Sequence, residues 1–399
     1  MSNTTHYFTS ITTCYLPKAR VLAKTLKYNN PSAIMHLVIA DDLPSSFRLE
    51  EEPFDYVWYP EQFINIENRE QWFYIHSVVE LCTAIKASAT LHIMKVTNAK
   101  NVIYLDPDIG VFDSLDSLEE MLENYSVLLT PHQTNPAKSK STIISDELCS
   151  LKHGVYNFGF FAVANDTDGH EFLNWWHYRL MHFCFDDIPN GMFTDQKWGD
   201  IAPALFPFVK IIHDETYNVA TWNLENRKIS KNDDIWLVNG KRLKFYHFSG
   251  FDSGAHRAML RNYANEGDPV WELSTQYEKM LNENGQALLG KSPCKYNIYA
   301  SGNRIENCHR SIFKARIDLQ NFFINPYSID CEKWMIKYFK EVNNFESIQS
   351  CYINLIKYKL KYKITFGERR KKNKSLYTYY KKKIIEYNEI VEKQLSNIK

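Results

Sequence analysis

Hydrophobic and polar residues follow two periodicities along the first 250 positions of the chain. Apolar and aromatic runs that predict β-strands lie at 6–15, 33–40, 54–60 and 101–109. Between them, helical spacing of apolar residues at 16–29 and from about 71 to 94 predicts amphipathic helices. Strands that alternate with helices indicate parallel pairing through βαβ crossovers, so the pattern predicts an α/β sheet covered on both faces.

The pattern changes its character near position 252. Before this point, further strands are predicted at 125–133, 157–165, 208–213, 234–239 and 241–250, with a helix at 169–185. After it, the spacing is mainly helical, most clearly at 269–285, and the chain ends in a tail rich in lysine and tyrosine. We therefore expect an α/β domain over 1–265, a helical accessory region over 266–350 and a basic, aromatic-rich tail over 351–399.

Composition excludes several classes of protein. The 47 basic and 47 acidic residues cancel, so the molecule as a whole is not a polyanion binder. Eight cysteines without a C-x-x-C pair favour reduced thiols over a zinc site. The first residues lack the charged and apolar regions of a signal peptide, and no window reaches the roughly 18 apolar residues of a membrane span.

The strand at 102–105 ends on an Asp106-Pro107-Asp108 turn. Ligands of α/β proteins bind at the carboxyl ends of the strands. Two carboxylates held close together there suit a hard cation such as Mg²⁺ or Mn²⁺, which keeps positions open for phosphate oxygens. The alternative is structural: Asp108 caps a turn and Asp106 is solvated.

Other polar residues stand at the ends of predicted strands. His247 closes a later strand, where a neutral imidazole is either a third metal ligand or a hydrogen-bonded structural residue. Asn157 enters another strand, and Asp195 and Gln196 lie on a polar turn. Taken singly, Asn157 is also consistent with a turn residue and Asp195 with a helix cap.

The order of these blocks carries more information than any one of them. Strand-D-x-D, N-x-G, D-Q, "NVATWNL" and H-F-x-G resemble, over about residues 5–252, the nucleotide-sugar glycosyltransferases of the GT-A fold, and most closely family 8. The segment "ELCTAIKA" is similar to a block of bacterial members. The resemblance implies a Rossmann-like mixed sheet flanked by helices, a GT-A catalytic domain over 1–265, and a mainly helical C-terminal extension.

The resemblance also implies roles for individual residues. The metal, Mn²⁺ or Mg²⁺, would be bound by Asp106, Asp108 and His247. The donor sugar would be surrounded by Asn157, Asp195 and Gln196. The nucleoside pocket would be lined by Thr12, Thr13 and Tyr15, and Lys86 would lie near the diphosphate. One departure concerns a phosphate-binding lysine that the family has soon after H-F-x-G and that this chain lacks. Arg257, His256 and Lys244 are the candidates to replace it.

The implied activity is metal-dependent transfer of a hexose from a nucleotide-diphosphate sugar, a UDP-sugar, to a glycan or lipid-linked acceptor in bacterial surface polysaccharide synthesis. The resemblance implies retention at the anomeric carbon, with Gln196 as a positioning group and Asp195 bonded to donor hydroxyls. A sugar-1-phosphate nucleotidyltransferase is disfavoured because the first strand is not followed by a glycine-rich loop. A non-catalytic carbohydrate-binding or scaffold protein stays open, with Trp175 and Trp176 as stacking candidates.

The tail concentrates positive charge. Residues 357–383 hold twelve Lys and Arg and one Glu, a net charge of +11 that the rest of the chain balances. Basic residues interleaved with aromatic ones suit an anionic membrane surface, which predicts a cytoplasmic protein held peripherally at the inner face of the cell membrane. Nucleic-acid binding is disfavoured, and a merely solvated helix is the alternative. In the segment 294–316, Asn303, Ile305 and Arg310 resemble a pattern of bacterial glycosyltransferase accessory regions, which implies contact with the acceptor or packing against the catalytic domain. The alternative is a loop and an amphipathic helix with ordinary surface charges.

Overall fold

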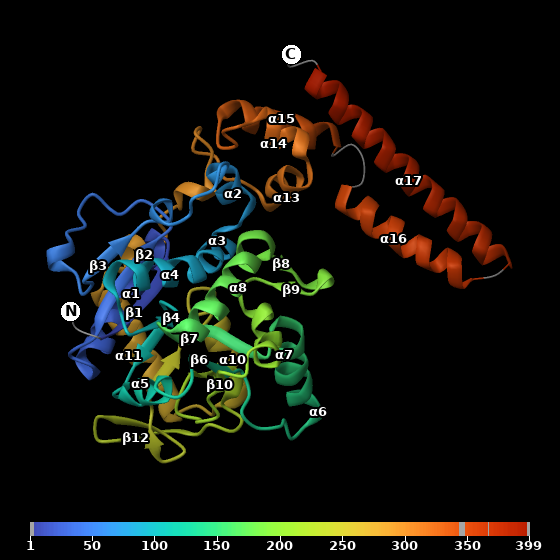
Figure 1. Ribbon diagram of the computed structural model, residues 1–399. Coiled ribbons are helices and arrows are strands. Elements are labelled where there is room, and N and C mark those ends of the chain that lie inside the picture. The colour runs from blue at the N-terminus through green and yellow to red at the C-terminus, as the bar shows by residue number, and fades with distance from the viewer. Residues whose placement is uncertain (1–3, 343–347, 366, 397–399) are drawn as a thin grey trace. The chain divides into compact units, whose positions relative to one another are not determined.

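Residues 1–298 form one unit, built on a seven-stranded sheet, and residues 299–399 form a second. The computed structural model describes residues 4–342, 348–365 and 367–396. In the first unit the strand order is β10-β6-β7-β4-β1-β2-β3 (Figure 1). The strands are β1 Thr5–Ile11, β2 Ile34–Ile39, β3 Tyr56–Trp58, β4 Asn101–Leu105, β6 Val127–Pro131, β7 Tyr156–Ala164 and β10 Val209–Ile211.

The sheet is mixed. The predicted parallel pairing is present between β1 and its neighbours β2 and β4, between β2 and β3, and between β6 and β10. Strand β7 runs antiparallel to both β4 and β6. The predicted fold class, a mixed α/β sheet with a helical C-terminal part, is confirmed.

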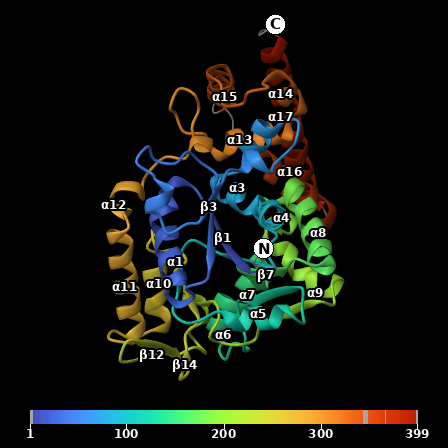
Figure 2. The same cartoon turned by 60° about the vertical axis from the view of Figure 1, so that its left-hand side comes forward.

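Helices cover both faces of this sheet. The helices of the first unit are α1 Leu16–Asn29, α2 Arg69–Ile75, α3 Val78–Ala84, α4 Lys86–Thr97, α5 Asp116–Leu122, α6 Lys140–Thr142, α7 Leu148–His153, α8 Thr167–Phe183, α9 Ala202–Leu205, α10 Ala255–Tyr263, α11 Pro269–Glu283 and α12 Gln286–Leu289. Because side chains alternate along a strand, Ile103 and Leu105 of β4 pack with α1, whereas Tyr104 packs with Phe161 and, through it, with Trp176 of α8. Figure 2 shows α1 and α8 on opposite sides of the sheet.

The long helix predicted over 71–94 is three helices. Ser77 begins α3 with a capping box, in which its backbone N–H donates to Glu80 Oε2 at 2.7 Å and its Oγ accepts from Glu80 N–H at 3.4 Å. A second break at Ile85 separates α3 from α4. The apolar spacing continues through both breaks, so periodicity alone did not reveal them.

The first unit also has smaller sheets, one of which adjoins the carboxyl end of β4. One has the order β11-β15-β5, from Val219–Ala220, Phe245–His247 and Ile109–Val111. The others are formed by β12 Ile229–Asn232, β13 Ile235–Val238 and β14 Lys241–Arg242, and by β8 Asp186–Asp187 with β9 Met192–Phe193. Since β4 and β5 are separated by three residues, 106–108, this turn joins the large sheet to the small one.

The second unit is helical where it is described. Its helices are α13 Asn307–Ala315, α14 Ile317–Phe322, α15 Ile329–Val342, α16 Ile348–Ile364 and α17 Gly367–Ser396. The unit begins at Tyr299, and α10, α11 and α12 belong to the first unit; the domain boundaries expected at 265 and 350 stay predictions. Within the described ranges, no helix combines the length and hydrophobicity needed to cross a bilayer.

Candidate active site

The Asp106-Pro107-Asp108 turn is held between the two sheets by backbone bonds. The amide of Asp106 donates to the carbonyl of Gly159 in β7 at 2.7 Å, and the amide of Ile109 donates back to the carbonyl of Asp106 at 3.0 Å. The carbonyl of Asp108 accepts from the amide of Phe248 at 2.8 Å. The position of each carboxylate therefore depends on hydrogen bonds that the backbone of its residue makes to the neighbouring strands.

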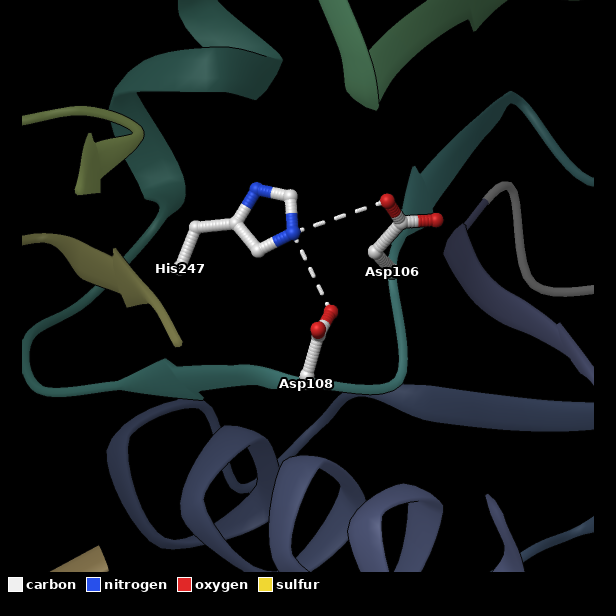
Figure 3. Close-up of side chains that lie close together, drawn as sticks. All are labelled: Asp106, Asp108 and His247. Carbon is white, nitrogen blue, oxygen red and sulfur yellow. Dashed lines mark ion pairs between the residues drawn. The ribbon is translucent and has the colours of Figure 1, made fainter. Parts of the chain in front are cut away.

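His247 faces these carboxylates because β15 pairs with β5 in an antiparallel register that sets it opposite Ile109. Its Nε2 lies 3.1 Å from Asp108 Oδ1 and 3.6 Å from Asp106 Oδ2 (Figure 3). One ligand atom from each of the three residues lies within 4.8 Å of the other two. The sequence-predicted metal triad is therefore brought together.

The triad attracts positive charge. Burial disfavours the imidazolium of His247, but the carboxylates of Asp108 and Asp106 outweigh burial and raise its pKa. Burial disfavours the carboxylate of Asp108, but His247 outweighs burial and lowers its pKa. A proton or a metal cation at the centre of the triad is favoured by the same two carboxylates.

Gly159 allows these side chains to approach β7. A Cβ at this position would lie 2.5 Å from His247 Cε1, 2.7 Å from Asn157 Oδ1 and 2.8 Å from Asp106 Oδ2. These separations are shorter than van der Waals contact, so any side chain here would displace two of the three candidate ligands. The site thus depends on the glycine of the N-x-G block, Gly159, as well as on its asparagine, Asn157.

Lys86 joins two sequence-predicted positions. The residue begins α4 and is only 2% exposed, and its Nζ lies 2.8 Å from Asp195 Oδ2 and 3.6 Å from Asp106 Oδ1. It also donates to the Phe158 carbonyl at 2.9 Å and lies 4.1 Å from the ring centroid of Tyr104. The Tyr104 hydroxyl in turn donates to Asp106 Oδ1 at 2.6 Å.

This cluster keeps Lys86 charged. Burial opposes the charge, but Asp106 and Asp195 outweigh burial and raise the pKa of the lysine. Burial raises the pKa of Asp195, while Lys86 opposes that rise. Because a buried ammonium without a partner is costly, the lysine and the two carboxylates stabilise one another.

Asn157 is oriented by a polar network behind the triad. Its Oδ1 accepts from Gly159 N–H and from Asn218 Nδ2, both at 3.0 Å, and its Nδ2 lies 3.1 Å from His132 Nε2. Burial holds the pKa of His132 near 4, so the ring is neutral and Nε2 accepts while Nδ1 donates to the Val155 carbonyl at 3.3 Å. The amide therefore has one defined orientation.

A cavity of about 510 Å³ lies against these groups. Its walls include the triad and Thr12, Tyr15, Lys86, Asn157, Asp195 and Gln196. Gln196 is anchored by an Nε2 bond to the His153 carbonyl at 3.0 Å. Thr13 is not among the residues that line the cavity; its amide donates to Asp41 Oδ2 at 3.0 Å, and its place in a nucleoside pocket stays a prediction.

The three candidates for a replacement phosphate-binding residue also lie outside the cavity lining. Lys244 pairs with Asp113 at 2.9 Å, and the exposed Arg257 is 3.7 Å from Glu278. His256 is buried, and burial lowers its pKa to about 4. None of the three presents a cation to the triad.

The fold places at the site several residues that received no individual role from the sequence. They are Tyr104, His132, Gly159, Asn218 and Trp222, whose ring centroid is 5.3 Å from that of His247. For His132 a signal existed, since it lies at the carboxyl end of the strand predicted at 125–133. Asn218 and Trp222 lie in the block "NVATWNL", but the contact of Asn218 with Asn157 depends on a positive φ of 51° and on a partner 61 positions away.

Comparison with known proteins gives no matching family model. The uncharacterized protein YfnF of Bacillus subtilis strain 168 is 32% identical over 154 residues, 38% of this chain and 50% of YfnF. YfnD of the same organism is 27% identical over 175 residues, 43% of this chain and 54% of YfnD. The chain spans about half the length of these curated relatives.

Among solved structures, the galactosyltransferase LgtC in complex with donor and acceptor sugar analogs is 13% identical, with 72% of this chain and 97% of LgtC covered and a TM-score of 0.38. The glycosyltransferase GlyE of Streptococcus pneumoniae TIGR4 is 17% identical, with 75% and 67% covered and a TM-score of 0.37. Through the order of its sequence motifs and the place of each motif in its own fold, the chain resembles the GT-A glycosyltransferases of family 8.

Proposed function

We propose that this chain is a metal-dependent glycosyltransferase. In this proposal it moves a hexose from a UDP-sugar to a glycan or lipid-linked acceptor in the synthesis of a bacterial surface polysaccharide, with retention at the anomeric carbon. The observation that supports it most is the convergence of Asp106, Asp108 and His247 on the wall of a cavity that also contains the Lys86–Asp195 ion pair.

The three residues fit a divalent cation. Two carboxylates and one imidazole are a hard donor set that suits Mn²⁺ or Mg²⁺, and Gly159 leaves room for them to converge. A cation held there would neutralise the charge that develops on the departing nucleoside diphosphate. The identity of the ion, Mn²⁺ or Mg²⁺, is part of the proposal.

The remaining site residues bind and orient the donor. Thr12 and Tyr15 line the nucleoside end, and Lys86 holds the Asp195 carboxylate where it accepts hydrogen bonds from hydroxyls of the donor sugar. Gln196, anchored on the His153 carbonyl, positions the group that reacts at the anomeric carbon. In this account Gln196 is a positioning group and does not take up a proton.

Neither alternative is favoured. A nucleotidyltransferase would need a phosphate-binding loop after β1, where this chain has a short 3₁₀ turn, Thr13–Tyr15, that leads directly into α1. As for a carbohydrate-binding scaffold, Trp176 is fully buried and packs against Phe158 and Phe161, so it offers no stacking surface.

Release of UDP from UDP-sugars without acceptor tests the proposal. Purified protein with Mn²⁺ or Mg²⁺ and a panel of UDP-hexoses is expected to release UDP slowly, because water replaces the acceptor. Excess EDTA should stop the release, and added Mn²⁺ should restore it. Full activity in EDTA would refute the metal assignment, and no release from any donor would favour the non-catalytic binding protein.

We further propose that the basic tail holds the protein on an anionic membrane surface at the cytoplasmic face. Residues 357–383 fall on α16 and α17, apart from Thr365 between the two helices and Phe366, which lies outside the described residues. The two helices pack side by side, with the rings of Tyr358 and Tyr380 stacked at 5.7 Å. On α16, Ile353, Ile356 and Leu360 are each more than half exposed and recur at helical spacing among the lysines.

Removal of residues 357–399 is expected to abolish binding to anionic vesicles and to lower activity on a membrane-borne acceptor, because each basic residue at such a surface contributes about 1 kcal/mol. Acceptor-free UDP release should not change. Co-sedimentation with phosphatidylglycerol-containing vesicles at about 0.1 M salt, a concentration at which exposed charges are partly screened, measures the binding, with phosphatidylcholine vesicles as the control. Equal sedimentation of the full-length and shortened chains would contradict this proposal.

A further inference from the structure

Besides Asp106, Asp108 and Asp195, the cavity is lined by a fourth aspartate that the proposed donor machinery does not use. Asp146 lines the cavity and is 3% exposed. It lies on a single π-helical turn, Ile143–Glu147, between α6 and α7. Such π-helical turns interrupt a helix at some cost and recur at functional sites.

The carboxylate is held by hydroxyl groups at one oxygen. Asp146 Oδ1 accepts from the Tyr263 hydroxyl at 2.5 Å and from Ser145 Oγ at 2.7 Å. Burial, together with the bond to Asp146, raises the pKa of Tyr263 to about 12, so the tyrosine remains a donor. Over the described ranges no hydrogen bond ends on Oδ2 and no basic side chain pairs with the carboxylate. Oδ2 therefore keeps acceptor capacity for a ligand.

The surroundings of Asp146 connect it to the metal triad. The π-helical turn packs against the 3₁₀ turn Thr221–Asn223, which carries Trp222. The ring of Trp222 contacts the ring of His247 edge-on. The backbone carbonyl of Trp222 accepts a hydrogen bond from Gln133 Nε2 at 2.6 Å. Ser145, Gln133 and Trp222 line the cavity with Asp146. The wall that carries Asp146 is thus different from the one that carries Lys86 and Asp195, yet both reach the triad.

The chemistry of this wall selects the ligand. An ionised carboxylate only accepts hydrogen bonds, so its partner must be a donor such as a hydroxyl group. A buried carboxylate without a cationic partner carries a desolvation cost, which a ligand hydroxyl would offset. An aromatic ring beside a few polar groups is the usual lining of a small-molecule site.

We propose that Asp146 binds a hydroxyl group of the acceptor, and that Ser145, Asp146 and Trp222 form an acceptor subsite for a sugar. The inference rests on the proposed glycosyltransferase function and names the substrate group that this wall binds. Asp146 acts here on binding and does not take part in the bond that breaks on the donor.

The test compares acceptor-free UDP release with sugar transfer in the wild type, Asp146→Asn and Tyr263→Phe. The probes are nitrophenyl and octyl glycosides of common hexoses, used with the UDP-sugar that the wild type hydrolyses. Asp146→Asn is expected to raise the acceptor KM by about tenfold or more, since a hydrogen bond to a charged group is lost, while UDP release stays within about twofold of the wild type. Tyr263→Phe leaves Ser145 to hold Asp146 and should have a smaller effect in the same direction.

Asp186→Asn is the matched control, because Asp186 is exposed and lies outside the cavity lining. An Asp146→Asn variant with an unchanged acceptor KM, or with UDP release reduced as much as transfer, would overturn the inference. Donor hydrolysis without transfer to any glycoside would overturn the claim of a sugar acceptor. A wild type without any donor turnover would remove the proposed function and this inference together.

Discussion

Replacement of Asp108 by asparagine is expected to lower kcat/KM for sugar transfer by about 10²–10³-fold and to leave the fold intact. The substitution removes one of two carboxylates that face His247 and so weakens the binding of a divalent cation. The backbone bond from Phe248 to the Asp108 carbonyl does not depend on the side chain. Asp106→Asn should behave similarly, and it should also remove the ion pair between Asp106 and Lys86.

Three measurements check this expectation: Mn²⁺ affinity by calorimetry, UDP release, and thermal unfolding. Asp113→Asn is the control, since Asp113 follows β5 but pairs with Lys244 outside the cavity lining. It should change neither Mn²⁺ affinity nor turnover. An Asp108→Asn protein that binds Mn²⁺ as tightly as the wild type would show that the triad is not the metal site.

Gly159→Ala is expected to abolish metal binding and turnover through steric displacement alone. The new Cβ would occupy space within 2.8 Å of atoms of His247, Asn157 and Asp106, so the candidate ligands must move apart. Overpacking at such a position also lowers the free energy of unfolding by about 1–3 kcal/mol. Calorimetric titration with Mn²⁺ and denaturant unfolding separate the two effects.

Gly110→Ala is the comparison for this substitution. Gly110 is also a strand glycine, but its added Cβ would meet the rings of Phe112 and Phe248 at 3.2 Å. We expect this variant to lose stability while it keeps measurable Mn²⁺ affinity. Wild-type Mn²⁺ affinity in Gly159→Ala would mean that the ligands do not converge where the structure has them.

The candidate site was predicted best where its residues end a strand. Asp106 and Asp108 follow the apolar run of β4, and ligands of α/β sheets bind at the carboxyl ends of strands. His247 ends the apolar run of β15, and the antiparallel pairing of β15 with β5 brings it to the two carboxylates. Lys86 was proposed to lie near the diphosphate through a block resemblance, and the fold adds its ion pairs with Asp195 and Asp106. Asp195 lies 109 positions after Lys86 in the sequence, and local sequence patterns do not predict contacts between residues so far apart.

By itself, the sequence determined the local elements: β4 and the turn that ends it, the helix α1 with Pro17 in its first turn, and the alternating pattern that predicts an α/β sheet. These follow from neighbouring residues through periodicity, backbone restriction and capping. Only the tertiary structure decided that β7 runs antiparallel, that Gly159 lies beneath the triad, and that Asp146 faces the same cavity. Strand direction and the convergence of side chains depend on packing between segments far apart in the chain, and that packing leaves no periodic trace in the sequence.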